Sequence, residues 1–186
     1  MTQPKLSALV AAVLLACSGC GGGSDISGTV VGLTADGLTL SNGFETITVA
    51  KDVTSFAFPT IVDDTKTYNV TVVTQPTGLR CTVANGSGTA ASNTDISNVI
   101  VTCVAAYPLS GTVSNLRNSG LVLNNGSEDV AVAAGAPTFA FPTPLSSGTN
   151  YDVTVQTEPS AQVCTVTDGA GTVASVAVTN VRIICN

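Results

Sequence analysis

The sequence predicts an all-β protein built from two tandem antiparallel β-sandwich modules, each closed by one disulfide. Three observations support this fold class: the chain repeats itself, its apolar residues alternate with polar ones over short segments, and its cysteines are shared equally between the two copies. No stretch after residue 24 has the 3.6-residue apolar period of an amphipathic helix. Charged residues make up only 10% of the 186 residues and hydrophobic ones 44%, which excludes a mainly disordered chain.

The repeat is the strongest of these observations. Ser27-Gly28-Thr29-Val30 recurs as Ser110-Gly111-Thr112-Val113, a difference of 83 in residue number. The same difference relates Asn42-Gly43 to Asn125-Gly126, Phe56-Ala57-Phe58-Pro59 to Phe139-Ala140-Phe141-Pro142, Tyr68 to Tyr151, and Cys81-Thr82-Val83 to Cys164-Thr165-Val166. The chain therefore divides into modules at 26–103 and 109–186, joined by a short linker at 104–108 that contains a proline and allows little swing.

Each module is expected to hold about seven short strands separated by turns, which is typical of a sandwich. In the first module the predicted strands are 26–31, 38–40, 46–49, 56–58, 68–73, 81–84 and 99–103. Asn42-Gly43 predicts a two-residue type I′ hairpin turn, because both residue types accept positive φ. The paired phenylalanines of each F-x-F segment, and Tyr68 with its counterpart Tyr151, fall on apolar faces and are interpreted as core; a ligand platform is the alternative for the tyrosines.

The cysteines predict two disulfides. Cys81 and Cys103 lie in the first module, and Cys164 and Cys185 in the second, so the simplest pairing is within each module. Disulfides form in oxidising compartments, where an exported chain folds. Closing a loop of this length contributes about 3 kcal/mol of stability in the chain-entropy model.

The front of the chain is interpreted as an export signal, residues 1–16. Lys5 precedes an apolar run at 6–16 that is too short to span a bilayer but matches the apolar region of a signal peptide. The segment Leu14-Leu15-Ala16-Cys17 resembles the lipobox of bacterial lipoproteins. The resemblance implies cleavage before Cys17 and lipidation of that residue, with Cys20 as the rival position and an ordinary secretory signal as the alternative.

Residues 17–25 are then expected to be the lipidated cysteine followed by a flexible Gly-rich tether. Ser18 follows Cys17 where an aspartate would imply retention in the inner membrane. By resemblance to enterobacterial sorting, this implies a lipid-anchored protein of the outer membrane, on its surface or its periplasmic face.

The SGTV, F-x-F and Y-x-VTV segments together are similar to those of prealbumin-like, collagen-adhesin B-type or Ig-like modules of exported bacterial proteins. Adhesin modules of this kind often carry a Lys–Asn isopeptide bond. Here Lys51 corresponds to Ala134 and Lys66 to Thr149, so the second module has no lysine. No isopeptide bond is expected, and the disulfides take its place.

Few residues suggest chemistry. The chain has no histidine, which removes the usual general base, and Lys51 and Lys66 fall in predicted turns. Glu45 and its counterpart Glu128 are interpreted as hairpin-face acids. Asp63-Asp64 with Asp52 is an alternative calcium site without a recognisable loop motif. We therefore expect no catalytic residue, no metal and no cofactor, and the net charge of -6 argues against nucleic acid as a partner.

The favoured hypothesis is a non-enzymatic, lipid-anchored cell-envelope protein that serves as a structural or adhesive surface module. Its membrane partner is reached through the lipid, and its further partner is an extracellular protein or glycan of unknown identity. The alternative is a periplasm-facing lipoprotein that binds carbohydrate or peptidoglycan. Duplication motivates the first hypothesis, because a repeated module extends reach and repeats a surface, whereas the catalytic site of an enzyme is seldom needed twice.

Overall fold

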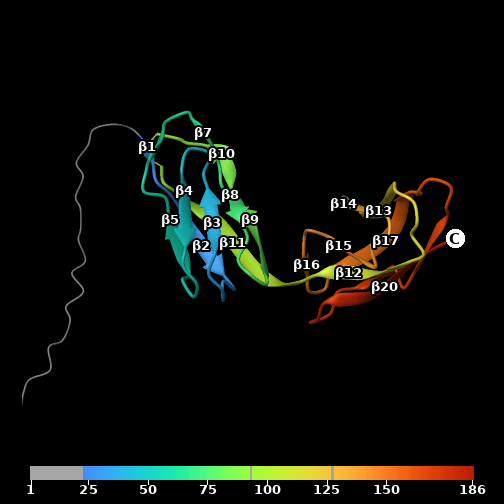
Figure 1. Ribbon diagram of the computed structural model, residues 1–186. Coiled ribbons are helices and arrows are strands. Elements are labelled where there is room, and N and C mark those ends of the chain that lie inside the picture. Colours follow the sequence, from blue (N-terminus) through green and yellow to red (C-terminus); the bar gives the residue numbers. More distant parts are fainter. Residues whose placement is uncertain (1–22, 93, 127) are drawn as a thin grey trace, which may run out of the picture.

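The computed structural model describes residues 23–92, 94–126 and 128–186, and all of their regular secondary structure is β-strand. Two lobes lie end to end and are joined by one stretch of chain (Figure 1). Each lobe has its own apolar core and one disulfide. The predicted fold class, two tandem β-sandwich modules with one disulfide each, is confirmed.

The strands of the first module are β1 (Gly23–Ser24), β2 (Ile26–Val31), β3 (Leu38–Ser41), β4 (Thr46–Val49), β5 (Ser55–Ala57), β6 (Val62–Asp63), β7 (Thr67–Asn69), β8 (Thr71–Thr74), β9 (Leu79–Ala84), β10 (Ser87–Thr89) and β11 (Ile96–Tyr107). Those of the second are β12 (Leu109–Ser114), β13 (Leu121–Asn125), β14 (Glu128–Val132), β15 (Thr138–Ala140), β16 (Leu145–Ser146), β17 (Asn150–Thr157), β18 (Cys164–Thr167), β19 (Ala170–Thr172) and β20 (Val178–Cys185).

The two modules have the same topology. In the first, β5, β2, β11 and β9 form one sheet, and β4, β3 and β8 form the other. In the second, the corresponding orders are β15-β12-β20-β18 and β14-β13-β17-β19. The single strand β17 covers the stretch that is divided into β7 and β8 in the first module. The sequence duplication is therefore also a duplication of strand order.

One pairing in each module differs from the predicted antiparallel arrangement. The first and last long strands lie parallel: β2 pairs with β11, and β12 pairs with β20. Both modules contain a register shift at the start of this ladder, between Ile96 and Val99 in one and between Leu109 and Gly111 in the other. Parallel neighbours require a long crossover, and nearly the whole module lies between these two strands.

The cores follow the period-2 patterns in the sequence. In β2 the side chains alternate between buried and less buried positions, so Ile26 and Val30 point inward with the Gly28 position between them. Leu38 and Leu40 of the facing sheet are fully buried, and Val70 is nearly so. The apolar side chains of both sheets thus meet in one core per module.

The two phenylalanines of each F-x-F segment pack edge to face. Phe56 and Phe58 have ring centroids 5.8 Å apart at 90°, and Phe139 and Phe141 have centroids 5.9 Å apart at 88°. All four rings are less than 8% exposed. Their predicted place in the core is confirmed, and edge-to-face pairs add stability beyond the area that they bury.

The predicted type of the turn at Asn42-Gly43 is wrong. Ser41 pairs with Thr46, so the connection is the four-residue loop 42–45 rather than a two-residue type I′ turn. Only Gly43 has positive φ, at +95°. Asn42 is buried, and its Oδ1 atom accepts hydrogen bonds from the backbone N–H groups of Phe44 and Glu45. The asparagine caps the loop from inside, an Asx arrangement that competes with the hairpin turn.

The chain enters both modules in the same way. Gly23 and Ser24 of β1 pair with Asp63 and Val62 of β6. Ala106 and Tyr107, at the end of β11, pair with Ser146 and Leu145 of β16. Every residue number in the second set is 83 higher than in the first, so these are two copies of one joint.

The joint at the start of the first module includes residues that were predicted to belong to the flexible tether. Ser24 was expected to be flexible, yet it is fully buried and its hydroxyl donates to the carbonyl of Ala91 over 3.0 Å. The N–H of Asp25 donates to the Asp95 carboxylate over 3.3 Å. Residues 23–25 are therefore attached to the first module, and the rest of the predicted tether lies outside the described residues.

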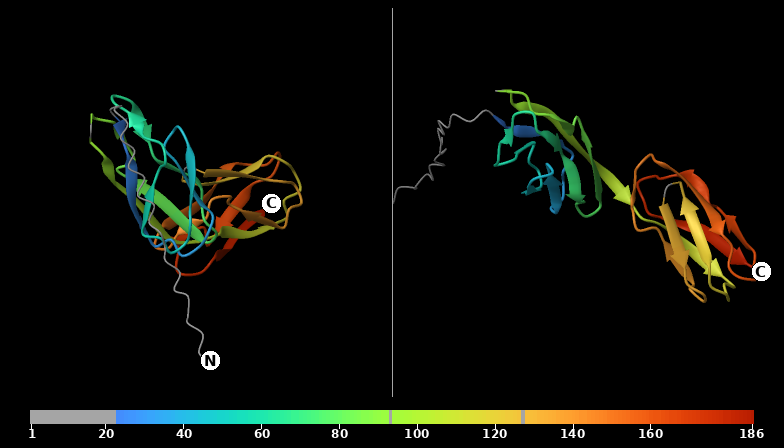
Figure 2. Two further views of the ribbon diagram at one scale, coloured as in Figure 1. Left: turned by 90° about the vertical axis from the view of Figure 1, so that its left-hand side faces the viewer. Right: turned by 90° about the horizontal axis from the view of Figure 1, so that it is seen from above.

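The predicted linker 104–108 is an extended strand for most of its length, because β11 continues to Tyr107. Figure 2 shows β11 passing from one lobe towards β12 of the other. The N–H of Ala106 donates to the carbonyl of Gly78 in the first module, and the carbonyl of Ala105 accepts from Ser147 in the second, both over 3.0 Å. The connecting strand is thus hydrogen-bonded to both modules.

Candidate functional site

The predicted signal peptide, Cys17 and Cys20 lie outside the described residues, so lipidation of Cys17 stays a prediction. The part of the chain that the structure describes contains no helix long and apolar enough to cross a membrane.

Two disulfides occupy matching positions. Cys81 bonds Cys103 between the antiparallel strands β9 and β11, and Cys164 bonds Cys185 between β18 and β20. In each case the two cysteines are directly opposite in the strand register. The bonds therefore tie the last strand of each module to its neighbour, and Cys81, Cys103, Cys164 and Cys185 are structural.

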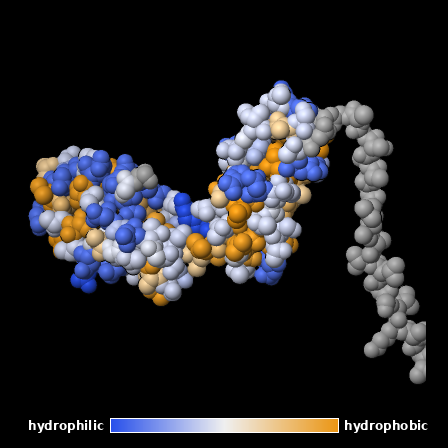
Figure 3. Space-filling view, turned by 180° about the vertical axis from the view of Figure 1, so that it is seen from behind, coloured by the Kyte–Doolittle hydropathy of each residue, from blue (hydrophilic) through white to orange (hydrophobic). Residues whose placement is uncertain are grey.

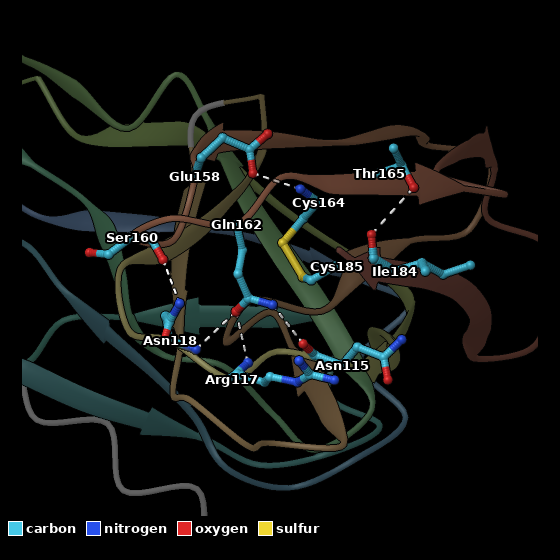
Figure 4. Close-up of a disulfide and its surroundings, with 10 residues drawn as sticks. All are labelled: Asn115, Arg117, Asn118, Glu158, Ser160, Gln162, Cys164, Thr165, Ile184 and Cys185. Carbon is cyan, nitrogen blue, oxygen red and sulfur yellow. Dashed lines mark hydrogen bonds between the residues drawn. A yellow bond between two sulfur atoms is a disulfide. The ribbon is translucent and has the colours of Figure 1, made fainter.

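In each module, the side chain six residues before the first disulfide cysteine hydrogen-bonds to the backbone of that cysteine. The Gln75 side chain accepts from the Cys81 N–H over 2.7 Å and donates Nε2–H to the Cys81 carbonyl over 3.0 Å. The corresponding Glu158 accepts from the Cys164 N–H over 2.8 Å (Figure 4). A carboxylate has no proton to donate, so the second module has only half of this arrangement. Gln75 and Glu158 occupy corresponding positions in the repeat, but the sequence did not indicate the cysteine backbone as their hydrogen-bond partner.

Beside the second disulfide, Gln162 connects two loops. Its Oε1 accepts from the N–H groups of Arg117 and Asn118, and its Nε2 donates to the carbonyl of Asn115 over 2.9 Å. Asn118 Nδ2 in turn donates to the Ser160 carbonyl (Figure 4). These contacts satisfy backbone groups at the end of the module, so the role of Gln162 is structural.

The two matching glutamates have a structural role that the sequence did not reveal. Glu45 accepts from the N–H and the hydroxyl of Thr60, each over 3.0 Å. Glu128 accepts from the N–H of Thr143 over 3.4 Å and from its hydroxyl over 2.6 Å. Each carboxylate thereby fastens the loop before β6 or β16 to the start of β4 or β14. The spacing of 15 residues carries no local periodicity, so sequence patterns could not identify the partner.

The aspartates considered for calcium are not gathered. Asp64 accepts from the Ser92 hydroxyl over 2.7 Å, whereas the Asp52 N–H donates to the carbonyl of Leu33 in another loop. Across residues 23–92, 94–126 and 128–186, no group of three or more His, Cys, Asp or Glu side chains is arranged to hold a metal ion.

The tyrosines are packing residues rather than a platform. Tyr68 lies opposite Gly88, and Tyr151 lies opposite Gly171. A Cβ atom at Gly88 or Gly171 would lie 2.8 or 2.7 Å from the respective phenolic oxygen. Each ring therefore covers a glycine in the neighbouring strand, and Tyr151 is only 8% exposed. This contact explains why the G-x-G-T segments at 86–89 and 169–172 occur together with Y-x-VTV in both copies.

A polar cavity lies between the modules. A cavity of about 370 Å³ is lined by Arg80, Asn125, Glu128, Thr143, Leu145, Ser146 and Thr149. A second cavity of about 360 Å³ includes Arg80 and the loops around Pro76 and Pro142. Arg80 lines both. On the face shown in Figure 3, a strongly hydrophilic group lies at the narrow waist between the lobes, next to white and orange atoms. Small-ligand sites often lie at such boundaries between domains. Arg80 was not singled out from the sequence.

Fold and site together define a tandem, disulfide-bonded β-sandwich protein whose described acidic and cysteine side chains serve mainly structural contacts. No protein-family model and no curated protein sequence matches the chain. Among solved structures, the Bacillus anthracis TIE protein is similar over 88% of this chain, at 13% identity and a TM-score of 0.33. The chain spans 33% of the length of that protein. The major pilin protein T-13 of Streptococcus pyogenes is similar over 89% of this chain and 96% of its own, at 12% identity and a TM-score of 0.22.

Proposed function

We propose that this protein is a non-enzymatic, lipid-anchored component of the bacterial cell envelope, in which two stapled modules act as a spacer that projects from the outer membrane. The repeated joint carries this proposal. The chain enters module one through β1–β6 and module two through β11–β16, with the same register in both. A protein whose segments are fastened end to end holds its far end at a defined distance from the point of attachment.

The proposed attachment is the Cys17 thiol. One acyl chain binds a bilayer only marginally, since each buried methylene contributes about 0.8 kcal/mol, whereas two or three chains give stable anchoring. The modules themselves have an acidic excess, consistent with the net charge of -6, and they would be repelled by anionic headgroups. The lipid would then supply the whole of the membrane attachment.

Labelled palmitate tests the anchor. We expect incorporation into the unaltered chain and into a Cys20→Ala variant, and none into Cys17→Ala. Cys20→Ala is the matched control, since it removes the neighbouring thiol from the same segment. Labelling that survives in Cys17→Ala and disappears in Cys20→Ala would move the anchor by three residues, and an unlabelled wild-type chain would contradict the lipoprotein proposal.

The absence of an enzymatic role is supported by the sequence and by the contacts of the acidic residues. No histidine is present to act as a base, and Glu45 and Glu128 each accept two hydrogen bonds from one threonine, which gives them a structural role. Turnover of any substrate in a broad hydrolase screen, retained after repurification, would contradict this part of the proposal.

A second candidate function, a periplasm-facing carbohydrate-binding lipoprotein, is favoured by the polar cavity around Arg80. The two candidates differ in where the modules lie. Protease treatment of intact cells should remove the modules if they project outward, and should spare them until the outer membrane is permeabilised if they face the periplasm. A periplasmic control protein must stay intact in the same samples.

A further inference from the structure

The cavity between the modules combines opposite charges with neutral polar groups. Arg80 contributes a guanidinium from the first module, and Glu128 contributes a carboxylate from the second. Among the described residues, the hydrogen bonds that Glu128 accepts come from Thr143 and not from Arg80. The two charges therefore face the same space without neutralising each other directly. An acidic ligand attracted by Arg80 would be opposed by Glu128, and a basic one would meet the reverse difficulty.

The neutral groups of the cavity are suited to hydroxyl-rich ligands. Asn125 supplies an amide, and Thr143, Ser146 and Thr149 supply hydroxyls. Arginine can only donate hydrogen bonds and a carboxylate can only accept them, whereas the hydroxyls of Ser146 and Thr149 can do both. The Thr143 hydroxyl donates its proton to Glu128 and can still accept. A sugar ring presents several hydroxyls, each of which both donates and accepts, and so can use every one of these groups. The volume of about 370 Å³ falls within the range of small-ligand sites.

The carboxylate is held in a fixed position. Each oxygen of Glu128 accepts one hydrogen bond from Thr143, over 2.6 Å from the hydroxyl and 3.4 Å from the N–H. A carboxylate oxygen has two lone pairs, so each can accept a further bond from a ligand. The cost of ordering this side chain is met within the folded protein, which favours binding.

The two sides of the cavity are also held in register. β16, which supplies Leu145 and Ser146, pairs with β11 from the first module, and the Ser147 N–H donates to the Ala105 carbonyl over 3.0 Å. Ala106 donates to Gly78, close to Arg80 on the other side. The strand that connects the modules therefore sets the distance between the arginine and the glutamate.

The duplication supplies an internal comparison. The matching cavity of the first module, about 230 Å³, is lined by Asn42, Phe44, Thr60, Ile61, Val62, Asp63 and Lys66. That lining contains neither an arginine nor Glu45, the counterpart of Glu128, and it includes the apolar side chains of Phe44 and Ile61. The two matching cavities therefore differ in their chemistry, and the pairing of an arginine with a glutamate is found in the one between the modules.

We propose that this cavity, formed by Arg80 of the first module and Glu128, Asn125, Thr143 and Ser146 of the second, binds a neutral glycan. Sugar hydroxyls accept from Arg80 and donate to Glu128. The proposal names a site for the second candidate function above, but it concerns binding alone and holds whichever side of the membrane the modules occupy.

The test uses the full chain in detergent against an array of neutral and uronic-acid oligosaccharides, followed by calorimetric titration of each oligosaccharide that binds. We expect binding to neutral oligosaccharides, with an affinity that changes less than twofold between about 0.05 M and 0.5 M salt, because no net charge is paired. A hydrogen bond to a charged group contributes about 1.5–3 kcal/mol, so Arg80→Met should weaken binding by about 10- to 100-fold.

Arg182→Met is the matched control, because Arg182 is exposed on β20 and does not line the cavity. It removes the same charge and should leave the affinity unchanged. Thermal unfolding of both variants separates lost binding from lost folding, and Ser146→Ala gives a second, smaller change within the cavity.

The proposal is overturned by an array on which no neutral oligosaccharide binds, by a preference for uronic acids that weakens with salt, or by equal effects of the two arginine substitutions. Loss of lipidation or a change in protease sensitivity would affect the proposed functions and not this result.

Discussion

The Phe56 ring lies against Gly28 in the neighbouring strand, and the Phe139 ring lies against Gly111 in the same way. A Cβ atom at Gly28 would come within 2.7 Å of the Phe56 ring and would also collide with the carbonyl oxygen of Val99. The SGTV and F-x-F segments are therefore one packing unit, in which glycine leaves the space that the aromatic ring fills. Covering a strand glycine with a cross-strand aromatic ring offsets the weakness of glycine in a sheet.

Gly28→Ala should destabilise the first module by about 1–3 kcal/mol, because the added methyl group overpacks the contact between β2, β5 and β11. Gly111→Ala should have the same effect on the second module, where Val181 and Phe139 occupy the space. Urea unfolding of the full chain, followed by module-specific amide exchange, measures both. Gly43→Ala is the control: no atom lies within 4 Å of its Cβ position, so its effect comes only from the positive φ. Equal stability of Gly28→Ala and the wild type would contradict the packing argument.

Replacing Cys81 and Cys103 together with serine should lower the stability of the first module by about 3 kcal/mol, since the bond closes a loop of 22 residues. The Cys164–Cys185 bond closes a loop of 21 residues, so the matching double substitution should lower the stability of the second module by a similar amount. Denaturant unfolding measures each loss. Peptide mapping under non-reducing conditions provides the check on connectivity, and a Cys81–Cys164 peptide would be incompatible with two separately closed modules.

Gln75→Glu should destabilise the first module by about 1 kcal/mol, because the Cys81 carbonyl loses the Nε2–H donor while the Cys81 N–H keeps an acceptor. The reverse substitution, Glu158→Gln, adds a donor beside Cys164 and should stabilise the second module by about 0.5–1 kcal/mol. The two variants act as mutual controls in thermal unfolding. Shifts of the same sign in both would mean that the amide–carbonyl bond is not responsible.

The backbone amides of Ala106 and Ser147 should exchange with solvent slowly, because they donate to Gly78 and Ala105 across the joint between the modules. Hydrogen exchange followed by NMR measures them individually. The amide of Gly43, in an exposed loop, is bonded only to the Ser41 hydroxyl and should exchange faster. If Ala106 and Ser147 exchange as fast as Gly43, the connecting strand does not hold the modules together.

The sequence predicted the features that depend on local alternation and on the repeat. β2 and β4 have the predicted bounds, the phenylalanines lie in the core, and the last strand of each module contains the predicted cysteine. The parallel pairing of β2 with β11 was not predicted, because strand direction depends on the path of the whole module. The two-residue strands β1, β6 and β16 were also missed, since so short a segment has no period.

The candidate sites were predicted less well than the fold. Glu45 and Glu128 were singled out, but their threonine partners are 15 residues away and were not. Arg80 was not predicted as a site residue, because the other residues that line its cavity come from the second module. Such a cavity is created by the joint between β11 and β16, and its parts have no common motif in the sequence.

The parallel pairing of β2 with β11 has a mechanical consequence. A pull between the residues before β2 and those after β11 drags the two strands lengthwise in opposite directions, so their ladder of hydrogen bonds is sheared as a set and is not unzipped one bond after another. Once the ladder ruptures, the Cys81–Cys103 bond keeps the intervening residues out of the stretched chain. At about 3.3–3.6 Å per residue, each oxidised module would lengthen by roughly 70–80 Å less than its reduced form. The disulfide therefore limits how far the protein extends after the strands have separated.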